Sequence, residues 1–272
     1  MVVDATGDGD VAARAGCSYD LGRPGDGQTQ PVTLFGTIGG YRGQPARGRA
    51  LVEILERGGW RPSYPPVTLF PQPGQPGVFV LMATQFYGVD GTNVRDLSRA
   101  ETLGRQEIRQ CVKAFKEHGG DDWKDVFLIK TGPAIGVRET RRIVGQYRLT
   151  GDDVLGGASF DDVIGLNAWP VERHLAGRIE WAFPRDAANA YNQLPWRMLV
   201  PQGETNLLVA GRCASMEHLG QSAARASGAC FVMGQAAGTA AALRVRGAFS
   251  VPALQARLAA DGADLDGAVP AA

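Results

Sequence analysis

Residues 206–243 read NLLVAGRCASMEHLGQSAARASGACFVMGQAAGTAAAL, and this stretch decides the fold of the chain. Its first part, residues 207–210, is a short apolar run that predicts a buried strand in a sheet covered on both faces. Gly211 follows at once, and a glycine at a strand end lets a backbone approach a ligand closely. Residues 222–243 predict a helix of small side chains, although each glycine costs ~1 kcal/mol relative to alanine. A sequence tolerates that cost where something must lie close to the helix backbone.

Three interpretations compete for this helix. Residues 226–243 carry no charge and approach membrane length, and Gly234-xxx-Gly238 is a packing pattern of membrane helices. The run is rich in alanine and glycine and contains Gln235 and Thr239, which argues against a membrane span. The helix either packs against a sheet, or it also directs its N-terminus at a cofactor, because free N–H groups and the helix dipole favour negative charge there. Periodicity does not separate the last two interpretations.

The composition is that of a globular protein with balanced charge. Among 272 residues, 28 are basic and 28 acidic, and 44% are hydrophobic. We therefore expect no nucleic-acid partner. The 4 cysteines show no C-x-x-C spacing and only 3 histidines occur, so neither a metal site nor a disulfide framework is expected. The start of the chain lacks a signal-peptide pattern, and isolated cysteines suit a reducing compartment, so we expect a cytoplasmic protein without a membrane partner.

Three pieces of the C-terminal stretch carry a family resemblance: AGRCAS at residues 210–215, an S-x-x-R pattern at residues 222–225 and GQAAGTAAAL at residues 234–243. Together they resemble the C-terminal signature of the FAD-dependent oxidoreductases related to glutathione reductase. In that family the strand and turn meet the ribityl and phosphate part of FAD, and the helix directs its N-terminus at the flavin pyrimidine ring. The resemblance implies these cofactor-binding positions: Gly211, Arg212, Gly234, Gln235 and Ala236.

The N-terminal residues 2–16 read VVDATGDGDVAARAG. They predict a strand, a tight turn and a short helix over residues 11–15 that Gly16 ends, with Asp8 or Asp10 as the cap. The same residues resemble the ATG-type motif of the family, whose backbone approaches the FAD pyrophosphate. The resemblance adds four further cofactor-binding positions: Ala5, Thr6, Gly7 and Asp8.

The position of this motif is unusual for the family. In the family a long segment precedes it, with a first strand, a G-x-G-x-x-G turn and a helix that hold the ADP half of FAD. Residues 36–43, GTIGGYRG, are rich in glycine but lack the strand–turn–helix context of a dinucleotide fingerprint. We therefore expect a chain that is truncated at its N-terminus, or one half of a split protein whose second chain supplies the ADP-binding half.

The middle of the chain predicts a mixture of strands and helices. Apolar residues recur at helical spacing over residues 96–118, and Ser250 begins a second clear helix at residues 250–260. Thr150-x-x-Asp153 is the signature of a helix start. Strands are predicted at residues 31–40, 78–86, 126–130, 142–149, 160–166, 167–174 and 191–201, with a short helix at residues 50–57.

Two histidines and one charged block are the candidates for chemistry. Residues 138–149, RETRRIVGQYRL, resemble a block that the family places where its two domains meet, and the charged side chains of this block either face the flavin pocket or form a structural ion pair. His174 stands in a pattern similar to one in the substrate region of the family, and His218 follows the Gly211 turn. A histidine titrates near neutral pH, so both are candidate catalytic residues, with a purely structural role as the alternative.

The family resemblance of these separated motifs implies an α/β flavoprotein: a partial FAD/NAD(P)-binding doubly wound domain with a β-rich substrate domain inserted in it. Residues 1–30 and 195–272 would form the FAD-binding part, and residues 31–194 the substrate domain. The resemblance implies an FAD-dependent oxidoreductase that transfers hydride between a small organic molecule and the flavin. The alternative is a non-catalytic fragment or subunit that binds FAD only with a second chain. Both depend on residues 6–7 lying beside Gly211.

Overall fold

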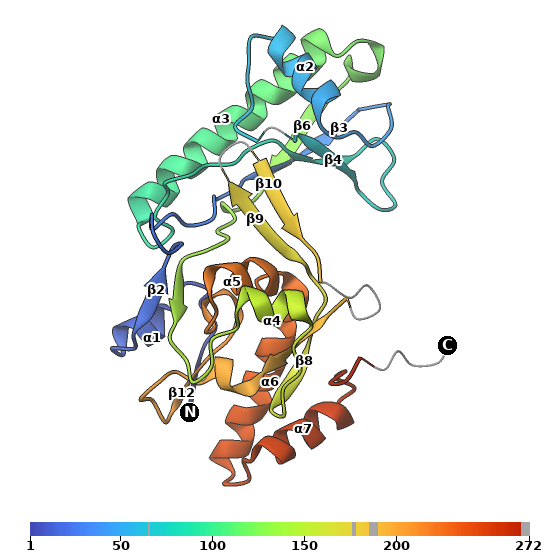
Figure 1. Cartoon of the computed structure of the whole chain (residues 1–272). Helices are drawn as coiled ribbons and strands as arrows, with labels where there is room; N and C mark the ends of the chain where they lie inside the picture. The colour runs from blue at the N-terminus through green and yellow to red at the C-terminus, as the bar shows by residue number, and fades with distance from the viewer. Residues whose placement is uncertain (65, 176–177, 185–189, 268–272) are drawn as a thin grey trace. The chain divides into compact units, whose positions relative to one another are not determined.

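The computed structural model describes residues 1–64, 66–175, 178–184 and 190–267, which fall into two compact units (Figure 1). The first unit contains residues 1–30, 138–175 and the chain from Ile179 onward, and the second contains Pro31–Val137 together with Arg178. The chain passes from the first unit to the second after Gln30. The expected boundary at residue 194 differs from the observed one at Val137, because residues 138–175 contribute apolar side chains such as Ile143 and Leu149 to the core of the first unit.

The first unit is built around two short parallel strands from opposite ends of the chain. Strand β1 (Val2–Asp4) pairs in parallel with β12 (Leu207–Val209), with Val2 opposite Leu207. All residues of β12 are buried, as its apolar sequence predicts. The Ala210 N–H donates to the carbonyl oxygen of Asp4 over 3.0 Å and extends the pairing beyond the strands. The prediction that the first residues of the chain meet the segment before Gly211 is confirmed.

The other strands that the structure describes in the first unit pair two by two, so the unit is a mixed α/β structure with small sheets. Strand β2 (Tyr19–Leu21) pairs with β7 (Arg141–Ile143), β8 (Val163–Asn167) with β11 (Asn192–Pro195), and β9 (Val171–Leu175) with β10 (Arg178–Ala182). Its helices are α1 (Asp10–Arg14), α4 (Gly151–Gly156), α5 (His218–Ala224), α6 (Ser227–Val245) and α7 (Val251–Ala260), and short 3₁₀ segments occupy Trp196–Leu199 and Gly211–Cys213.

The helix predicted from residue 222 is in fact two helices. The chain bends by 93° between α5 and α6, at Arg225 and Ala226 (Figure 1). Ala226 has extended backbone angles, and the Arg225 side chain turns into the protein to meet Glu172 at 3.4 Å. Small residues allow a helix at every position, so composition did not reveal the break. No helix among the described residues is by itself long and apolar enough to cross a membrane; only α5 and α6 taken together meet that criterion, as a bent pair.

The structure confirms the predicted caps of two helices and contradicts the predicted cap of a third. Thr150 and Asp153 form the predicted capping box at α4, and the Ser250 hydroxyl accepts from the Ala253 N–H at α7. The predicted cap of α1 by Asp8 or Asp10 is wrong. The buried Asp4 carboxylate instead accepts from the Ala12 N–H over 2.8 Å, because the turn folds the first turn of α1 back over the end of β1.

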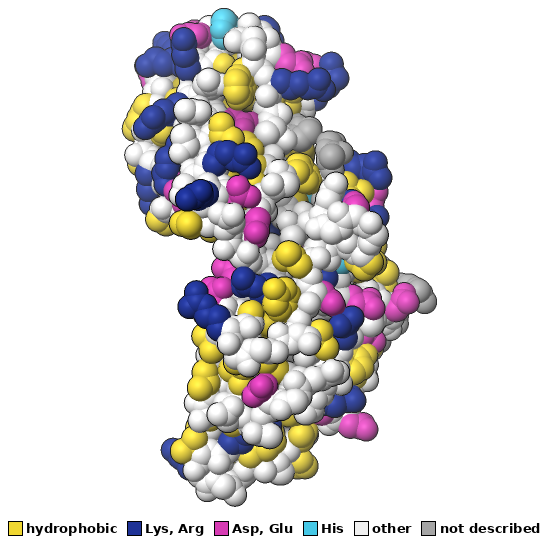
Figure 2. Space-filling view, turned by 90° about the vertical axis from the view of Figure 1, so that its left-hand side faces the viewer, with side chains coloured by type: hydrophobic (Ala, Val, Ile, Leu, Met, Phe, Trp, Pro, Cys, Tyr) yellow, Lys and Arg dark blue, Asp and Glu magenta, His cyan; other side chains and the backbone are white. Residues whose placement is uncertain are grey.

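The second unit is a four-stranded antiparallel sheet packed against a long helix. The strand order is β4 (Thr68–Pro71), β5 (Phe79–Met82), β3 (Phe35–Gly39) and β6 (Phe127–Thr131). Helix α3 (Val94–His118) packs against β3 and β6 and against α2 (Arg49–Arg57), and a 3₁₀ turn at Asp121–Trp123 follows it. Of the apolar positions of α3 that periodicity identified, Ile108, Cys111 and Phe115 are fully buried, whereas Leu103 is 45% exposed and lies outside the core. Figure 2 shows basic and acidic side chains lying next to one another on the surface of this unit.

The chain leaves the first unit after Gln30 and returns to it at Arg138, and side chains of the first unit hydrogen-bond to both residues. The Gln221 side chain donates to the Arg138 carbonyl oxygen over 2.8 Å and accepts from the Gln30 side chain over 3.4 Å. The Gln30 N–H donates to the buried Glu139 carboxylate over 2.8 Å. Residues 30 and 138 are therefore fixed by the same side chains of the first unit.

Candidate functional site

The ends of β1 and β12 form the first part of the site. We call residues 4–8 and 211–212 the strand-end region. The Asp4 carboxylate accepts from the N–H and the hydroxyl of Thr6, at 3.0 and 2.7 Å, and so fixes the turn. Both terminal guanidinium nitrogens of Arg212 donate to Asp8, at 3.2 and 3.1 Å. The turn is therefore tied to Arg212 by an ion pair between residues that are 204 positions apart in the sequence.

Glycine is required where these segments approach each other. Gly7 has φ +80°, and a Cβ there would lie 2.5 Å from Nη2 of Arg212. Gly211 has φ +83°, and the nearest atom to an added Cβ is the sulfur of Cys230 at 3.9 Å. Both backbones therefore depend on glycine for their conformation. Around Gly211 the protein also leaves space, which fits a ligand that approaches the backbone.

Helix α6 begins beside this region without a side-chain cap. Ala226 is its N-cap, and Ser227 and Gly228 at its first turn are exposed. Cys230, in the same turn, places its sulfur 3.9 Å from where a Cβ of residue 211 would lie, and α6 packs against the 3₁₀ segment at Gly211–Cys213. The first N–H groups of a helix have no partner within the helix, so this start can donate to a ligand with oxygen acceptors.

The structure brings some of the predicted cofactor positions together and separates others. Six of the predicted positions lie in the strand-end region, where Ala5 and Thr6 are exposed: Ala5, Thr6, Gly7, Asp8, Gly211 and Arg212. Gly234, Gln235 and Ala236 lie about two turns inside α6, away from its first turn. Gly234 and Gln235 are exposed and Ala236 is fully buried in the core.

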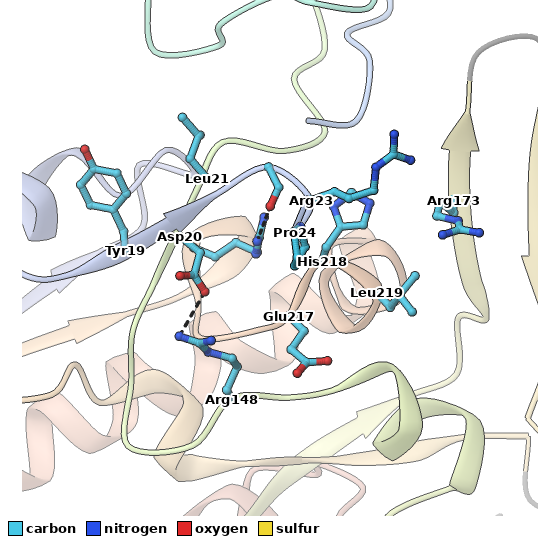
Figure 3. A pocket seen from close by; sticks show the side chains of 12 residues that line it. Tyr19, Asp20, Leu21, Arg23, Pro24, Arg148, Arg173, Glu217, His218 and Leu219 are labelled. Carbon is cyan, nitrogen blue, oxygen red and sulfur yellow. Dashed lines mark hydrogen bonds and ion pairs between the residues drawn. The ribbon is translucent and has the colours of Figure 1, made fainter. Parts of the chain in front are cut away.

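A cavity of about 720 Å³ forms the second part of the site, and we call it the His218 cavity (Figure 3). Its wall comes from β2 and the loop after it, from β7 and β9, and from the start of α5 (Figure 3). Arg148 and Asp20 form an ion pair of 3.1 Å on one side of it. The lining residues are Tyr19, Asp20, Leu21, Gly22, Arg23, Pro24, Arg142, Arg148, Arg173, Glu217, His218 and Leu219.

His218 stands on a buried network of charges at this cavity. Its Nδ1 lies 3.0 Å from Oε1 of Glu139, and the guanidinium of Arg142 contacts the same oxygen. Glu139 and Arg142 are 1% and 2% exposed, so both charges are removed from water. Arg142 also donates to the carbonyl oxygens of Met216 and Gly22, at 3.0 and 2.8 Å. Burial lowers the pKa of Arg142, although the Glu139 carboxylate opposes this shift.

His174 lies in a different environment. Its Nε2 is 3.2 Å from the Glu172 carboxylate, and its side chain is 3% exposed. Burial lowers the pKa of His174 against the opposing hydrogen bond with Glu172, and the charges of Arg138 and Arg225 lower it further. Burial acts to raise the pKa of Glu172, but the hydrogen bond with His174 and the charge of Arg225 outweigh it and lower this pKa. His174 is thus part of a buried ionic cluster and does not line the His218 cavity.

Cysteine and metal chemistry find little support in the described part of the chain. All four cysteines are free thiols, and burial raises the pKa of Cys213 to about 12. The nearby Asp4 carboxylate acts in the same direction. Among the residues that the structure describes, no group of three His, Cys, Asp or Glu side chains could hold a metal ion.

Two important residues were missed by the sequence reasoning. Asp4 organises the whole strand-end turn, and the only available signal was a carboxylate at the end of an apolar strand. Gln221 fixes residues 30 and 138, and nothing in its local sequence marks it. Asp4 acts through contacts within the first twelve residues, whereas Gln221 contacts segments that are distant in sequence.

A comparison with models of known families gives one finding. Residues 1–260 match the model described as FAD dependent oxidoreductase. Searches of curated proteins and of solved structures returned no match. The matched residues include the strand-end region, the His218 cavity and the two candidate catalytic histidines, His174 and His218.

Proposed function

The chain belongs to the FAD dependent oxidoreductase family, and from this premise we propose that it oxidises or reduces a small organic molecule by hydride transfer with its cofactor, FAD. The observation that carries the proposal is the joining of residues 4–8 to Gly211 and Arg212 at the ends of two parallel strands. Ligands of α/β proteins bind at the carboxyl ends of such strands. The flavin supplies the redox chemistry, and the protein supplies position and charge.

The residues present fit this cofactor. Its diphosphate, its ribityl hydroxyls and the carbonyl groups of its ring are hydrogen-bond acceptors that need close backbone donors. The open space at Gly211, the exposed Thr6 and the uncapped start of α6 offer such approaches. We propose that Thr6, Gly7 and Gly211 hold the polar chain of FAD. This is a partial doubly wound site, related to that of glutathione reductase.

The first turn of α6 has a proposed electrostatic role. A helix N-terminus carries roughly half a positive elementary charge and favours negative charge beside it. The exposed Ser227 and Gly228 lie where this field reaches the surface. We propose that the first turn, and not the mid-helix Gly234 and Gln235, accommodates negative charge on the bound flavin. His218 and His174 remain the proposed acid–base residues, and residues 31–137 the proposed main part of the substrate domain.

Gly211→Val tests the strand-end assignment. Valine has a strongly unfavourable energy at φ +83° and would place methyl groups where the cofactor approaches, so we expect loss of flavin uptake. Gly203→Val is the matched control, because Gly203 also has φ +83° and an added Cβ meets no atom within 4 Å. Equilibrium dialysis against FAD, followed by the visible flavin spectrum, measures the difference. Equal uptake by the two variants would remove Gly211 from the site.

A second function is favoured by the open edge of β1. Among the described strands β1 pairs only with β12, and Val2 is 46% exposed. A parallel strand with a free edge can accept another strand. We propose as the alternative that a second chain supplies the ADP-binding half, and that the present chain alone binds FAD weakly. A purified chain with a full equivalent of tightly bound flavin would contradict this alternative.

A further inference from the structure

We propose that the His218 cavity is the substrate site, with Nε2 of His218 as the proton-accepting atom and Glu139 as its positioning residue. The substrate would be a small alcohol or amine. This inference rests on the proposed oxidoreductase function. Its first part, the state of the His218 ring, is a property of the chain without cofactor and is tested separately.

The contacts of Glu139 determine which nitrogen of His218 carries a proton. The Gln30 N–H donates to one carboxylate oxygen at 2.8 Å, and Arg142 donates to the other. Neither of these groups can accept a hydrogen bond, so both oxygens act as acceptors. Nδ1 of His218, 3.0 Å from Oε1, must therefore be the donor. In the neutral ring this leaves Nε2 with a lone pair.

Nε2 is the nitrogen that remains available. No described residue hydrogen-bonds to it, and His218 lines a cavity of about 720 Å³, within the usual size range of small-ligand sites. His174 differs on both points, because its Nε2 is held by Glu172 at 3.2 Å and it does not line the cavity. Of the two candidate catalytic histidines, the geometry favours His218.

The chemistry follows from this arrangement. When an alcohol or amine is oxidised, the O–H or N–H bond breaks, its proton passes to Nε2, and the remaining electron pair forms a C=O or C=N bond. The carbon loses a hydride in the same reaction, and FAD, when bound, would supply the two-electron acceptor for it. Glu139 stabilises the imidazolium that forms, and Arg142 keeps the carboxylate in place.

The cavity wall indicates a polar substrate. Glu217 is exposed and lines the cavity, and Arg148 and Arg173 are tied to Asp20 and Glu180 through only part of their guanidinium groups. Their other N–H groups can donate to hydroxyl or carboxylate oxygens of a bound molecule. A purely apolar substrate would leave these charged groups desolvated without partners.

The tautomer of His218 is the first test. ¹⁵N NMR of the whole chain without flavin, at a pH where the ring is neutral, should show hydrogen on Nδ1 and none on Nε2. His218→Gln identifies the signal, and Glu139→Gln should shift the ring toward a mixture of tautomers. Hydrogen on Nε2 in the wild-type chain would overturn the inference whatever the flavin does.

Chemical modification gives a second test that needs no variant. Diethyl pyrocarbonate reacts with an available imidazole lone pair, and peptide mass spectrometry locates the product. His118, with a side chain 37% exposed, should react, and His174, at 3% and held by Glu172, should not. The His218 side chain is only 7% exposed, but it lines the cavity and its Nε2 has no described partner, so we expect it to react there. A His218 as inert as His174 would contradict an accessible Nε2.

The flavin-loaded protein then tests the role in turnover. His218→Gln should lower the rate of substrate-dependent flavin reduction by about 10²-fold or more and leave flavin uptake unchanged. His118→Gln, on α3 of the second unit, is the matched control and should retain the wild-type rate. Loss of flavin uptake in Gly211→Val concerns the proposed cofactor site, whereas an undiminished rate in His218→Gln would remove only the present inference.

Discussion

The strand-end region and the His218 cavity lie in the same unit but are built in opposite ways. The first is shaped by backbone: glycines at φ +80° and +83°, hydrogen bonds within a turn, and one partly exposed ion pair. The second is shaped by side chains, with Glu139, Arg142 and His218 brought together in the interior. Backbone sites leave a mark in local sequence because glycine spacing is constrained. Side-chain networks leave almost none.

Glu139→Ala is expected to have the largest effect and would show how much the cavity depends on buried charge. It leaves Arg142 buried without its anion, and breaking a buried pair in this way typically costs about 3–5 kcal/mol of unfolding free energy. Urea denaturation measures the change. Asp261→Ala is the control in the same unit, because the Arg257–Asp261 pair is exposed and should contribute at most about 1 kcal/mol. A loss below 1 kcal/mol for Glu139→Ala would mean that the contacts of Glu139 with Arg142 and His218 contribute little to the stability of the fold.

Gly7→Ala tests the other half of the comparison. An alanine at φ +80° is strained, and its Cβ would displace Arg212 from Asp8, so we expect a loss of about 1–3 kcal/mol. Gly16→Ala carries similar strain at φ +94° but meets no neighbouring atom. The difference between the two variants in thermal or urea unfolding isolates the contact with Arg212. Equal losses would indicate that the close approach is unimportant.

The pH dependence of the unfolding free energy should show the lowered pKa of His174. Burial and the positive charges of Arg138 and Arg225 lower its pKa in the folded state below the ordinary value of 6.5, despite the carboxylate of Glu172. Below pH 6.5 the unfolded chain therefore binds a proton that the folded chain resists, and stability falls as the pH decreases. His174→Gln should remove this component from denaturation curves measured between neutral and mildly acidic pH. An unchanged slope in the variant would assign it to other groups.

Gly228→Ala is expected to have the smallest effect and the opposite sign. No atom lies within 4 Å of an added Cβ, and alanine favours a helix, so the variant should gain about 0.5–1 kcal/mol. Gly238→Ala, farther along α6, should gain similarly. If the cofactor approaches the first turn, only Gly228→Ala should weaken FAD binding in dialysis. Equal binding by both variants would argue against that approach.

Much of the fold was predictable from local patterns. The apolar strand before Gly211, the periodic helix α3 and the caps at Thr150 and Ser250 were found because each depends on residues close in sequence. The bend at Arg225 was missed because alanine-rich sequence favours a helix on both sides of it. The second unit was predicted to end at residue 194, since the sequence after Val137 does not reveal which core it joins.

The candidate site also has one part that local sequence predicted and one part that it did not. Glycine-containing motifs indicated the strand-end region, whose parts meet as predicted, while its role with the cofactor stays a prediction. The two histidines could not be ranked from sequence. Both are equally buried, and they differ in which ring nitrogen is engaged and in which of them lines the cavity.

The contacts of Gln221 with Gln30 and Arg138 carry a consequence for evolution. Because the first unit itself fixes both crossing points, we expect the contiguous stretch of residues 31–137 to tolerate exchange or shortening by recombination, with Arg178 as the described residue of the second unit that lies outside it. All residues that line the His218 cavity belong to the first unit, so such an exchange would retain the cavity.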